Sequence, residues 1–578
     1  MRKYDVDFVN QNLIFMVDED TTVAKACEAA GFPLDLVCNG KGTCGKCKVE
    51  VEIDDEKSII LACKTKISSA VRIYITENDY QKRANILESN FDENYKLNPS
   101  VKKTYKDKKS IKKETEGEFL KNCDLHVLKK FSAMINQKEC KGITFVRHEN
   151  KIIDVQLNDT TAYLYGAAID IGTTTVVLYI YDLNTGKLLN AYSDLNGQIS
   201  MGADVISRIS YGSSENGTKE LNGKIINTLN NMVQRAEIEI PFLNENLYNI
   251  ILCGNSTMQH LFFGLRPDNL GVSPFTSITK GYIECCGEDV SLKCAERCKV
   301  IFLPLLGGFV GSDTTAVLMT VEEDNKNKLI IDLGTNGEIA AGNIDNYYVA
   351  STACGPALEG GSIECGMRGT VGALEKFKIT NGELSSKVIG GNEPIGICGS
   401  GIIDVTAELL RYSIIDSTGR LITRDEMAKI KPGSELSKNL ETVDGINRFV
   451  IYRSNDNNVY ITQKDIRQIQ LAKSSIYTGC MTILNAYGKN LEEIDEVIVA
   501  GAFGNYIDAE NAVFIGLFPN ALSKIKSVGN GAGKGASMFL LDEDMRKKCD
   551  KIAANSTHYE LANDQDFTEE YINNMNFN

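Results

Sequence analysis

The first eighty residues carry the two-residue apolar period that is typical of strands. Residues 6–9 and 13–17 alternate in this way and predict a hairpin, and residues 48–53 and 71–75 predict further strands. Residues 22–30 instead place apolar side chains at helical spacing. The pattern therefore predicts a β-sheet that is crossed by one helix.

A longer pattern occurs twice in the rest of the chain. Residues 168–181 and 330–350 each contain an apolar strand, an Asp-x-Gly-Thr turn and a second apolar strand, and further turn and strand residues follow each unit. Helical patterns follow both units, at 202–209 and 399–410. Two such units about 160 residues apart indicate a duplicated architecture with two related halves.

Residues 81 to about 120 differ from both parts in composition. Residues 101–113 contain seven lysines and one aspartate, and blocks of this kind are typical of solvated, extended chain. The stretch is predicted to be a flexible tether, with an electrostatic contact to an acidic partner as the alternative. A small folded segment is predicted from Leu120 to about Leu164, with a helix near 125–131 and a strand at 152–157.

Composition narrows the class of protein. A length of 578 residues predicts about three or four domains, and the 43% hydrophobic and 24% charged residues are ordinary for globular proteins. The net charge of −15 argues against nonspecific nucleic-acid binding. No apolar run is long enough for a membrane span and the N-terminus lacks a signal-peptide core, so a cytoplasmic protein without a membrane partner is expected.

Four cysteines near the N-terminus carry the most specific chemistry, because thiolates are the ligands that iron–sulfur clusters need. Glycines between them let backbone N–H groups turn toward the sulfurs. The spacing C-x5-C-x2-C is one residue longer than the plant-type pattern, and zinc is the competing interpretation of the Cys-x2-Cys pair. A zinc site usually has a second such pair, so a 2Fe–2S cluster is favoured. Its predicted ligands are Cys38, Cys44, Cys47 and Cys63.

A second concentration of cysteines lies further along the chain, at Cys285, Cys286, Cys294 and Cys298. A second metal site and unligated thiols are both open here, and unligated thiols are favoured because scattered cysteines in apolar segments are typical of reduced proteins.

The repeated Asp-x-Gly-Thr turns suit a nucleotide polyphosphate and its magnesium ion. The carboxylates of Asp170 and Asp332 can hold Mg²⁺, while glycine admits a close backbone approach and hydroxyl and N–H groups bind oxygens. One such turn could be an ordinary hairpin, but two equivalent turns can clamp a polyphosphate from both sides. The predicted phosphate-binding residues are Gly172, Thr173, Thr174, Gly334, Thr335 and Asn336.

A third element is a buried strand at 497–500 that runs into the glycine turn of Gly501, Gly504 and Asn505. Bare backbone of this kind is a site where adenosine can rest. Residues 529–533 are predicted to be another flexible glycine loop, ahead of a helix at 535–541.

Two phosphate hairpins followed by an adenosine turn resemble, in that order, the actin-like ATPase superfamily. With the N-terminal cysteine motif, the whole chain resembles the reductive activators of corrinoid proteins, and the stretches 202–208, 254–260, 353–360 and 397–404 match as well. The fold class that follows is a multidomain α+β and α/β chain, with a β-grasp ferredoxin domain, a linker and duplicated RNase H-like lobes. The predicted boundaries are 1–80, 81–164, 165–325 and 326–578.

The resemblance implies ATP-dependent return of an inactive Co(II) corrinoid to Co(I), with electrons passing through the cluster. The implied cofactors are the 2Fe–2S cluster, ATP and Mg²⁺, and the implied partners are a corrinoid protein and a low-potential electron donor. A homodimer is compatible with the family. Glu338 is a candidate base or water-positioning residue, with an outward-facing strand glutamate as the alternative. Ser400 could offer a hydroxyl to the partner's cofactor, although a helix N-cap is favoured there.

Two other functions would use the same nucleotide-binding cleft between the two predicted lobes. A small-molecule kinase with a fused redox domain needs the same nucleotide residues, but it has no need to pass electrons. An ATP-driven electron donor to a non-corrinoid, low-potential enzyme is the second alternative.

Overall fold

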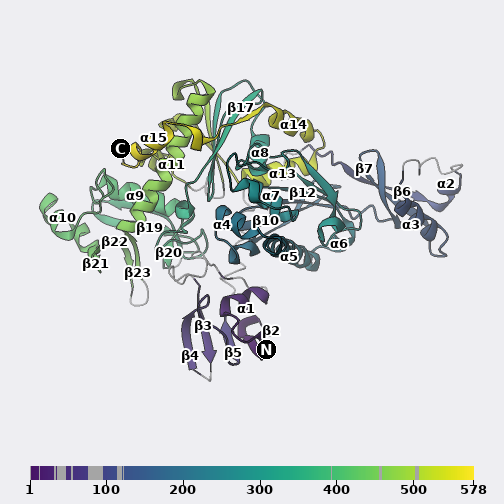
Figure 1. Cartoon of the computed structure of the whole chain (residues 1–578), viewed down its shortest axis with the longest axis horizontal. Coiled ribbons are helices and arrows are strands. Elements are labelled where there is room, and N and C mark those ends of the chain that lie inside the picture. The colour runs from purple at the N-terminus through teal and green to yellow at the C-terminus, as the bar shows by residue number, and fades with distance from the viewer. Residues whose placement is uncertain are drawn as a thin grey trace.

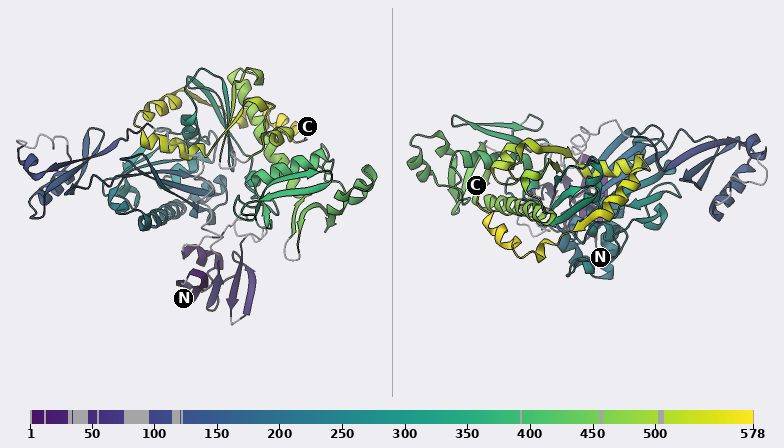
Figure 2. Two further views of the ribbon diagram at one scale, coloured as in Figure 1. Left: turned by 180° about the vertical axis from the view of Figure 1, so that it is seen from behind. Right: turned by 90° about the horizontal axis from the view of Figure 1, so that it is seen from above.

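The computed structural model describes residues 2–11, 13–30, 34, 47–53, 56–75, 96–113, 120, 123–391, 393–454, 458–501 and 507–577. Figure 1 shows four parts: a small N-terminal sheet, a second small sheet at one end of the long axis, and two larger α/β lobes. Figure 2 shows the same separation from behind and from above. No helix in these ranges combines the length and apolar character that crossing a bilayer requires.

The N-terminal part is a five-stranded sheet in the order β2-β1-β5-β3-β4, with helix α1 on one face. Alternate strand residues such as Val6, Phe8 and Val51 are buried against α1, as the two-residue period predicts. The parallel pairing of β1 with β5 completes the β-grasp arrangement. The elements are β1 (Lys3–Phe8), β2 (Leu13–Asp18), α1 (Val23–Ala29), β3 (Lys48–Ile53), β4 (Glu56–Leu61) and β5 (Val71–Tyr74).

The second small sheet has the order β6-β7-β8 and corrects one prediction. The lysine-rich stretch 101–113 is not a tether, because it forms β6 and α2. Lys103 donates to the carbonyl oxygen of Tyr163 (2.6 Å) and to the side chains of Gln156 and Asn246, and this burial lowers its pKa to about 7. Its neighbours lie on an exposed edge strand, where lysine is common. The elements are β6 (Val101–Asp107), α2 (Lys108–Lys113), α3 (Leu125–Ile135), β7 (Gly142–His148) and β8 (Lys151–Leu157).

The first lobe has a six-stranded sheet in the order β11-β10-β9-β12-β14-β13. Nearly every residue of β9, β10 and β12 is buried, since helices cover the sheet. The strands are β9 (Tyr165–Ile171), β10 (Thr175–Asp182), β11 (Leu188–Leu195), β12 (Leu247–Gly254), β13 (Ile283–Cys286) and β14 (Lys299–Phe302). The helices are α4 (Val205–Gly212), α5 (Glu215–Glu239), α6 (Leu243–Asn246), α7 (Ser256–Phe262) and α8 (Ser312–Thr320).

The second lobe repeats this sheet in the order β25-β24-β15-β16-β17-β26. In each lobe three antiparallel strands are followed by two parallel ones, so β9, β10, β11, β12 and β14 correspond to β15, β16, β17, β24 and β25. The strands are β15 (Lys328–Leu333), β16 (Gly337–Asn343), β17 (Asn346–Thr352), β24 (Glu496–Ala500), β25 (Ile525–Gly529) and β26 (Ser556–His558). The helices are α11 (Gln463–Tyr487), α12 (Ala509–Phe514), α13 (Gly531–Leu541), α14 (Met545–Asn555) and α15 (Phe567–Asn573). The predicted duplicated lobes are confirmed.

Two small sheets are inserted between β17 and α11, and they form the end of the molecule opposite the β6–β8 sheet (Figure 1). The sequence patterns did not predict them. Their elements are β18 (Ala373–Thr380), β19 (Glu383–Val388), β20 (Gly396–Ile397), α9 (Gly399–Arg411), α10 (Arg424–Ile430), β21 (Leu440–Val443), β22 (Ile446–Arg453) and β23 (Asn458–Thr462).

Helices α8 and α13 join the lobes through an unusually close contact. An added Cβ at Gly535 of α13 would lie 1.9 Å from the carbonyl oxygen of Ala316 in α8. Small residues at this crossing let the two backbones touch.

The prediction of a flexible glycine loop at 529–533 is wrong in part, because α13 already begins at Gly531 with Asn530 as its N-cap.

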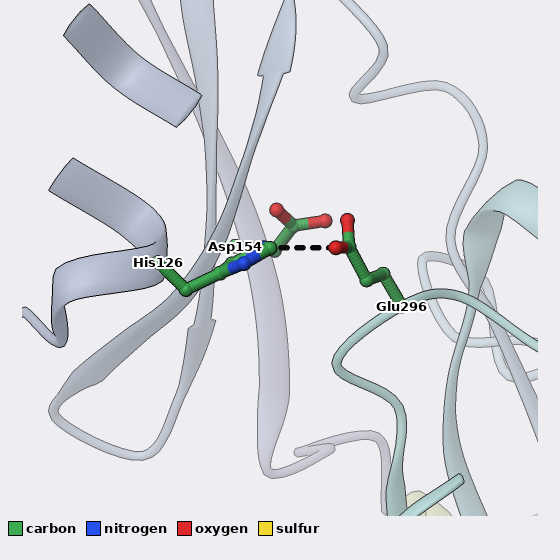
Figure 3. A group of neighbouring side chains, drawn as sticks. All are labelled: His126, Asp154 and Glu296. Carbon is green, nitrogen blue, oxygen red and sulfur yellow. Dashed lines mark ion pairs between the residues drawn. The ribbon is translucent and has the colours of Figure 1, made fainter. Parts of the chain in front are cut away.

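An ion-pair network attaches the β6–β8 sheet to the first lobe. The Lys130 ammonium lies 2.6 Å from the buried Asp154 carboxylate and 3.3 Å from Glu296, and the Tyr248 hydroxyl donates to Asp154 (2.6 Å). His126 lies 3.2 Å from Glu296 (Figure 3). In the described ranges, His126, Asp154 and Glu296 are the group that brings three candidate metal-ligand atoms within 4.8 Å of one another. Because Lys130 already supplies the positive charge, we interpret the group as an ion-pair network.

This network makes a prediction about local stability. Asp154→Ala removes the acceptor of Tyr248 and leaves Lys130 with only the half-exposed Glu296, so the opening free energy of β7 and β8 should fall by about 3 kcal/mol. Amide hydrogen exchange measures this quantity. Glu296→Gln is the control, since Glu296 is half exposed and its loss should cost less than about 1 kcal/mol. Equal effects of the two substitutions would contradict the assignment.

Candidate functional site: a carboxylate-lined cleft and an N-terminal cysteine pair

A cavity of about 970 Å³ lies between the lobes, and both Asp-x-Gly-Thr hairpins line it. The hairpins connect β9 to β10 and β15 to β16, which are equivalent positions of the two sheets. Because the lobes face each other across the cavity, the two turns meet from opposite sides. All of the predicted nucleotide residues that the structure describes, and Ser400, which was predicted to contact the partner's cofactor, line this cavity: Asp170, Gly172, Thr173, Thr174, Asp332, Gly334, Thr335, Asn336, Glu338, Ser400 and Gly501.

The first hairpin is held by side chains from elsewhere in its lobe. The Gly172 N–H donates to the Thr175 carbonyl oxygen (3.0 Å), and an added Cβ at Gly172 would lie 2.6 Å from that oxygen. The Thr173 hydroxyl accepts a hydrogen bond from the Asn255 amide (3.0 Å). Asn255 also caps α7 by accepting from the Met258 N–H, so a single side chain fixes both the helix and the turn.

A fully buried arginine supports the same turn. The Arg208 guanidinium donates to the carbonyl oxygens of Gly202 (2.8 Å) and Thr173, and burial lowers its pKa to about 9. The stretch 202–208 matched the family in sequence, but its role was not predicted. Only the fold reveals that Arg208 brings a positive charge directly behind the first Asp-x-Gly-Thr turn.

The second hairpin is bonded differently. The Gly334 N–H donates to the Asn336 carbonyl oxygen (3.0 Å), and the Thr335 hydroxyl donates to a Glu359 carboxylate oxygen (3.0 Å). Gly501 follows β24 beside this hairpin with φ +104°, and an added Cβ there would lie 2.4 Å from the Leu333 carbonyl oxygen. Glycine is thus required where the predicted adenosine turn begins. Gly504 and Asn505 lie outside the described residues.

Four carboxylates converge in the cavity: Glu338 is buried, and Asp170, Asp313 and Asp332 are partly buried. Burial, together with the charge of Asp313, raises the pKa of Asp170 to about 7, and burial with the charges of Asp313 and Asp170 raises the pKa of Asp332 to about 8. Burial raises the pKa of Asp313 to about 6 and that of Glu338 well above its usual range. Like charges at such a site disfavour ionisation of each other, so a bound cation is the natural partner of the group.

Asp313 was missed by the sequence patterns. It lies in the first turn of α8, which follows β14; in the other lobe Asn530, the N-cap of α13 after β25, hydrogen-bonds Asp170. The pseudo-symmetry of the lobes could have found both residues, but the short run Gly311-Ser312-Asp313 has no distinctive pattern of its own.

Glu338 and Ser400 are both turned inward. Glu338 is 9% exposed and accepts a hydrogen bond from the Ser351 hydroxyl (3.2 Å), so the alternative of an outward-facing strand glutamate is wrong. The Ser400 hydroxyl donates to the Glu375 carbonyl oxygen (3.0 Å) and lies 3.4 Å from the Cys398 thiol. The N-cap of α9 is Cys398, so Ser400 is not a helix cap.

Two of the four predicted cluster cysteines are described, and the sheet brings them together. Cys47 lies at the start of β3 and Cys63 just after β4, and the Ala62 N–H donates to the Cys47 carbonyl oxygen (2.9 Å). Cys47 is buried and Cys63 is partly buried, which fits soft thiolate ligands of a 2Fe–2S cluster. Cys38 and Cys44 lie outside the described residues.

The second cysteine concentration surrounds the turn between β13 and β14. An added Cβ at Gly287 would lie 2.1 Å from the Cys294 sulfur, and Cys298 is fully buried. Within the ranges that the structure covers, no three of Cys285, Cys286, Cys294 and Cys298 bring their sulfurs within 4.8 Å of one another. This arrangement favours unligated thiols.

The fold and the site define a class: a ferredoxin-type domain joined to an actin-like ATPase module. Residues 7–68 match the 2Fe-2S iron-sulfur cluster binding domain, which confirms the predicted cluster domain. Residues 165–326 match the RACo middle region, and residues 326–578 match the C-terminal domain of RACo, the ASKHA domain.

Relatives over the full length give the family. The chain is 41% identical over 581 residues to the "Corrinoid activation enzyme RamQ" of Eubacterium limosum, covering 97% of both chains. It is 24% identical to the "[Co(II) methylated amine-specific corrinoid protein] reductase" of Methanosarcina barkeri, over 72% of this chain and 77% of that one. A solved structure titled "Reductive activator for corrinoid,iron-sulfur protein" aligns with a TM-score of 0.75 and 28% identity, over 99% and 98% of the two chains. The chain belongs to the family of reductive activators of corrinoid proteins.

The carboxylate group makes a prediction about pH. Because the pKa of Asp332 rises from 3.8 to about 8 on folding, the folded protein binds more protons than the unfolded chain between these pH values. Without a divalent cation, stability should therefore fall as the pH rises from about 4 to about 8, and then level off.

Asp332→Asn removes one of these charges, so at pH 8 the cation-free variant should be more stable than the native protein by about 2 kcal/mol. At pH 4, close to the unfolded pKa, the two should differ little. Thermal unfolding at both pH values, in chelator, measures this difference. A variant that is less stable at pH 8 would contradict the raised pKa.

Proposed function

We propose that this protein returns an inactive Co(II) corrinoid protein to Co(I) in a reaction that requires ATP and uses the N-terminal 2Fe–2S cluster. One observation carries this proposal: a ferredoxin domain and a two-lobed nucleotide cleft lie in one chain that aligns, over 97% of its length, with a corrinoid activation enzyme. The redox domain favours this function over a kinase.

In the nucleotide cleft, Asp170, Asp313 and Asp332 are proposed to hold Mg²⁺ directly or through water. Their shared burial and mutual repulsion support this role, because a divalent cation would relieve both. Thr173, Thr174, Thr335 and Asn336, with the N–H groups of Gly172 and Gly334, are proposed to bind phosphate oxygens. Gly501, Gly504 and Asn505 are proposed to form the adenosine site.

Glu338 is the proposed base or water-positioning residue. Its carboxylate lies in the cavity wall, and burial together with the charges of Asp313 and Asp332 raises its pKa, which makes the carboxylate a stronger proton acceptor. The Ser351 hydroxyl fixes its orientation.

The cluster, when bound to Cys38, Cys44, Cys47 and Cys63, carries single electrons. The described part of the chain holds Cys47 and Cys63 at one end of the β3–β4 hairpin, where the Ala62 N–H donates to the Cys47 carbonyl oxygen. A low-potential electron donor is the proposed source of electrons.

Nucleotide binding is proposed to couple to reduction by closing the lobes. Both hairpins must approach the same polyphosphate, so ATP favours a closed arrangement over an open one by its difference in affinity for the two. Ser400 lies at the edge of this cleft with its hydroxyl engaged by Glu375, so contact with a partner's cofactor would require α9 to move. We also propose a cytoplasmic location, and a homodimer remains compatible with the family.

The proposal predicts ATP-dependent formation of Co(I). A Co(II) corrinoid protein mixed anaerobically with this protein, a strong reductant and MgATP should develop the Co(I) absorbance, whereas ADP or no nucleotide should leave Co(II). Asp332→Asn should reduce the rate at least about 100-fold, because one carboxylate of the cation site is lost. Equal Co(I) yields with and without ATP would refute the coupling.

The cluster ligands make a separate prediction. The anaerobically purified protein should contain about two irons and two acid-labile sulfides per chain. Cys47→Ser and Cys63→Ser should each lose most of this iron and the visible spectrum. Cys123→Ser, in the β6–β8 part, is the matched control and should keep both. Zinc in place of iron would overturn the assignment.

A further inference from the structure

Among the residues that the structure describes, one cation in the wall of the cleft has no anionic partner. Arg368 lines the cavity, and its Nη1 atom is buried without a hydrogen-bond partner among the described residues. Lys387, the other basic residue in the described lining, instead forms an ion pair with Glu375 at 2.7 Å. A guanidinium nitrogen that is removed from water without an acceptor costs free energy, which a ligand oxygen would recover.

The backbone around Arg368 is fixed. The Met367 N–H donates to the Ile397 carbonyl oxygen (2.8 Å), which places Arg368 next to Cys398 at the start of α9. On the other side, Gly360 has φ +78° and packs so closely that an added Cβ would lie 2.7 Å from the Met367 nitrogen. Arg368 is therefore presented from a rigid segment, which suits a residue that recognises a ligand.

This segment is connected to the second phosphate hairpin. The Thr335 hydroxyl donates to Glu359 (3.0 Å), and Glu359 immediately precedes Gly360, which contacts Met367. Arg368 thus belongs to the same wall as the hairpin and lines the same cavity as the carboxylates of Asp170, Asp313 and Asp332. An anion that enters this acidic cavity needs a positive charge besides the metal ion, and Arg368 is positioned to provide it.

We infer that Arg368 binds the terminal phosphate of ATP and thereby makes the cleft distinguish ATP from ADP. Guanidinium groups suit this task because their planar N–H donors match the geometry of phosphate oxygens. The inference rests on the proposed ATP-dependent function and adds a residue that no sequence motif indicated. In this role the terminal phosphate is contacted by a cation of the inserted β18–β20 region as well as by the two hairpins.

The experiment compares equilibrium binding of a non-hydrolysable ATP analogue and of ADP, both with Mg²⁺, to the full-length protein carrying its cluster. Isothermal titration calorimetry gives both dissociation constants. Arg368→Met should weaken analogue binding on the order of 10- to 100-fold, while ADP binding changes less than about 3-fold. Arg368→Lys keeps the charge but loses the bidentate geometry, so its effect should be intermediate.

The matched control is Arg453→Met. Arg453 lies on β22 outside the cavity lining, pairs with Glu441 and is 47% exposed, so its loss should leave both affinities unchanged. The visible spectrum of the cluster and the melting temperature verify that each variant is folded. Should Arg368→Met fail this check, the lysine variant decides the case.

Three results would overturn the inference. They are unchanged affinity for the analogue, an equal loss for both nucleotides, and a defect confined to corrinoid reduction with normal nucleotide discrimination. The last would assign Arg368 to an anionic group of the partner. If the native protein itself binds neither nucleotide, the proposed function fails instead, and the two failures are thus distinguishable.

Discussion

The repulsion among solvent-shielded carboxylates between the lobes is the constraint on which the rest of the cleft depends. Asp170 and Asp332 lie near the ends of equivalent strands, and Asp313 lies in the first turn of α8. Desolvation makes the ionisation of Asp170 and Asp332 costly, and the charge of Asp313 raises the pKa of both. Such a group lowers the stability of the cation-free protein at neutral pH and favours a bound cation. In the proposed function, the metal ion of the nucleotide would relieve this repulsion.

The other residues of the cleft complement the carboxylates. They supply positive charge and hydrogen-bond donors where phosphate oxygens are expected. Arg208 lies behind the first turn, and Arg368 lies on the wall formed by the inserted region. Asn255 fixes the first turn and Glu359 the second, so neither turn depends on its own residues alone. The duplicated lobes differ here: the first is held by an amide and a buried arginine, and the second by a carboxylate.

The sequence predicted the elements that have strong local patterns. The alternating strands, the Asp-x-Gly-Thr hairpins and the cysteine motif identified the family, which the comparisons confirm. It could not predict Asp313, Asn530 or Arg368, because their importance comes from distant strands that bring them to one cavity. The lysine-rich stretch was misjudged for a related reason. Composition records how many charges the stretch carries, but it does not show what they contact. The hydrogen-bond acceptors of Lys103 lie 53 to 143 positions away in the sequence.

The contact between α8 and α13 has a mechanical consequence. Gly535 meets the backbone of Ala316 without an intervening side chain, so at this point no side chains have to separate when the helices turn against each other. Interlocked side chains resist rotation, whereas a smooth crossing acts as a pivot. Rocking of one half of the molecule about this point would widen or narrow the far rim of the cleft while its floor stays nearly fixed.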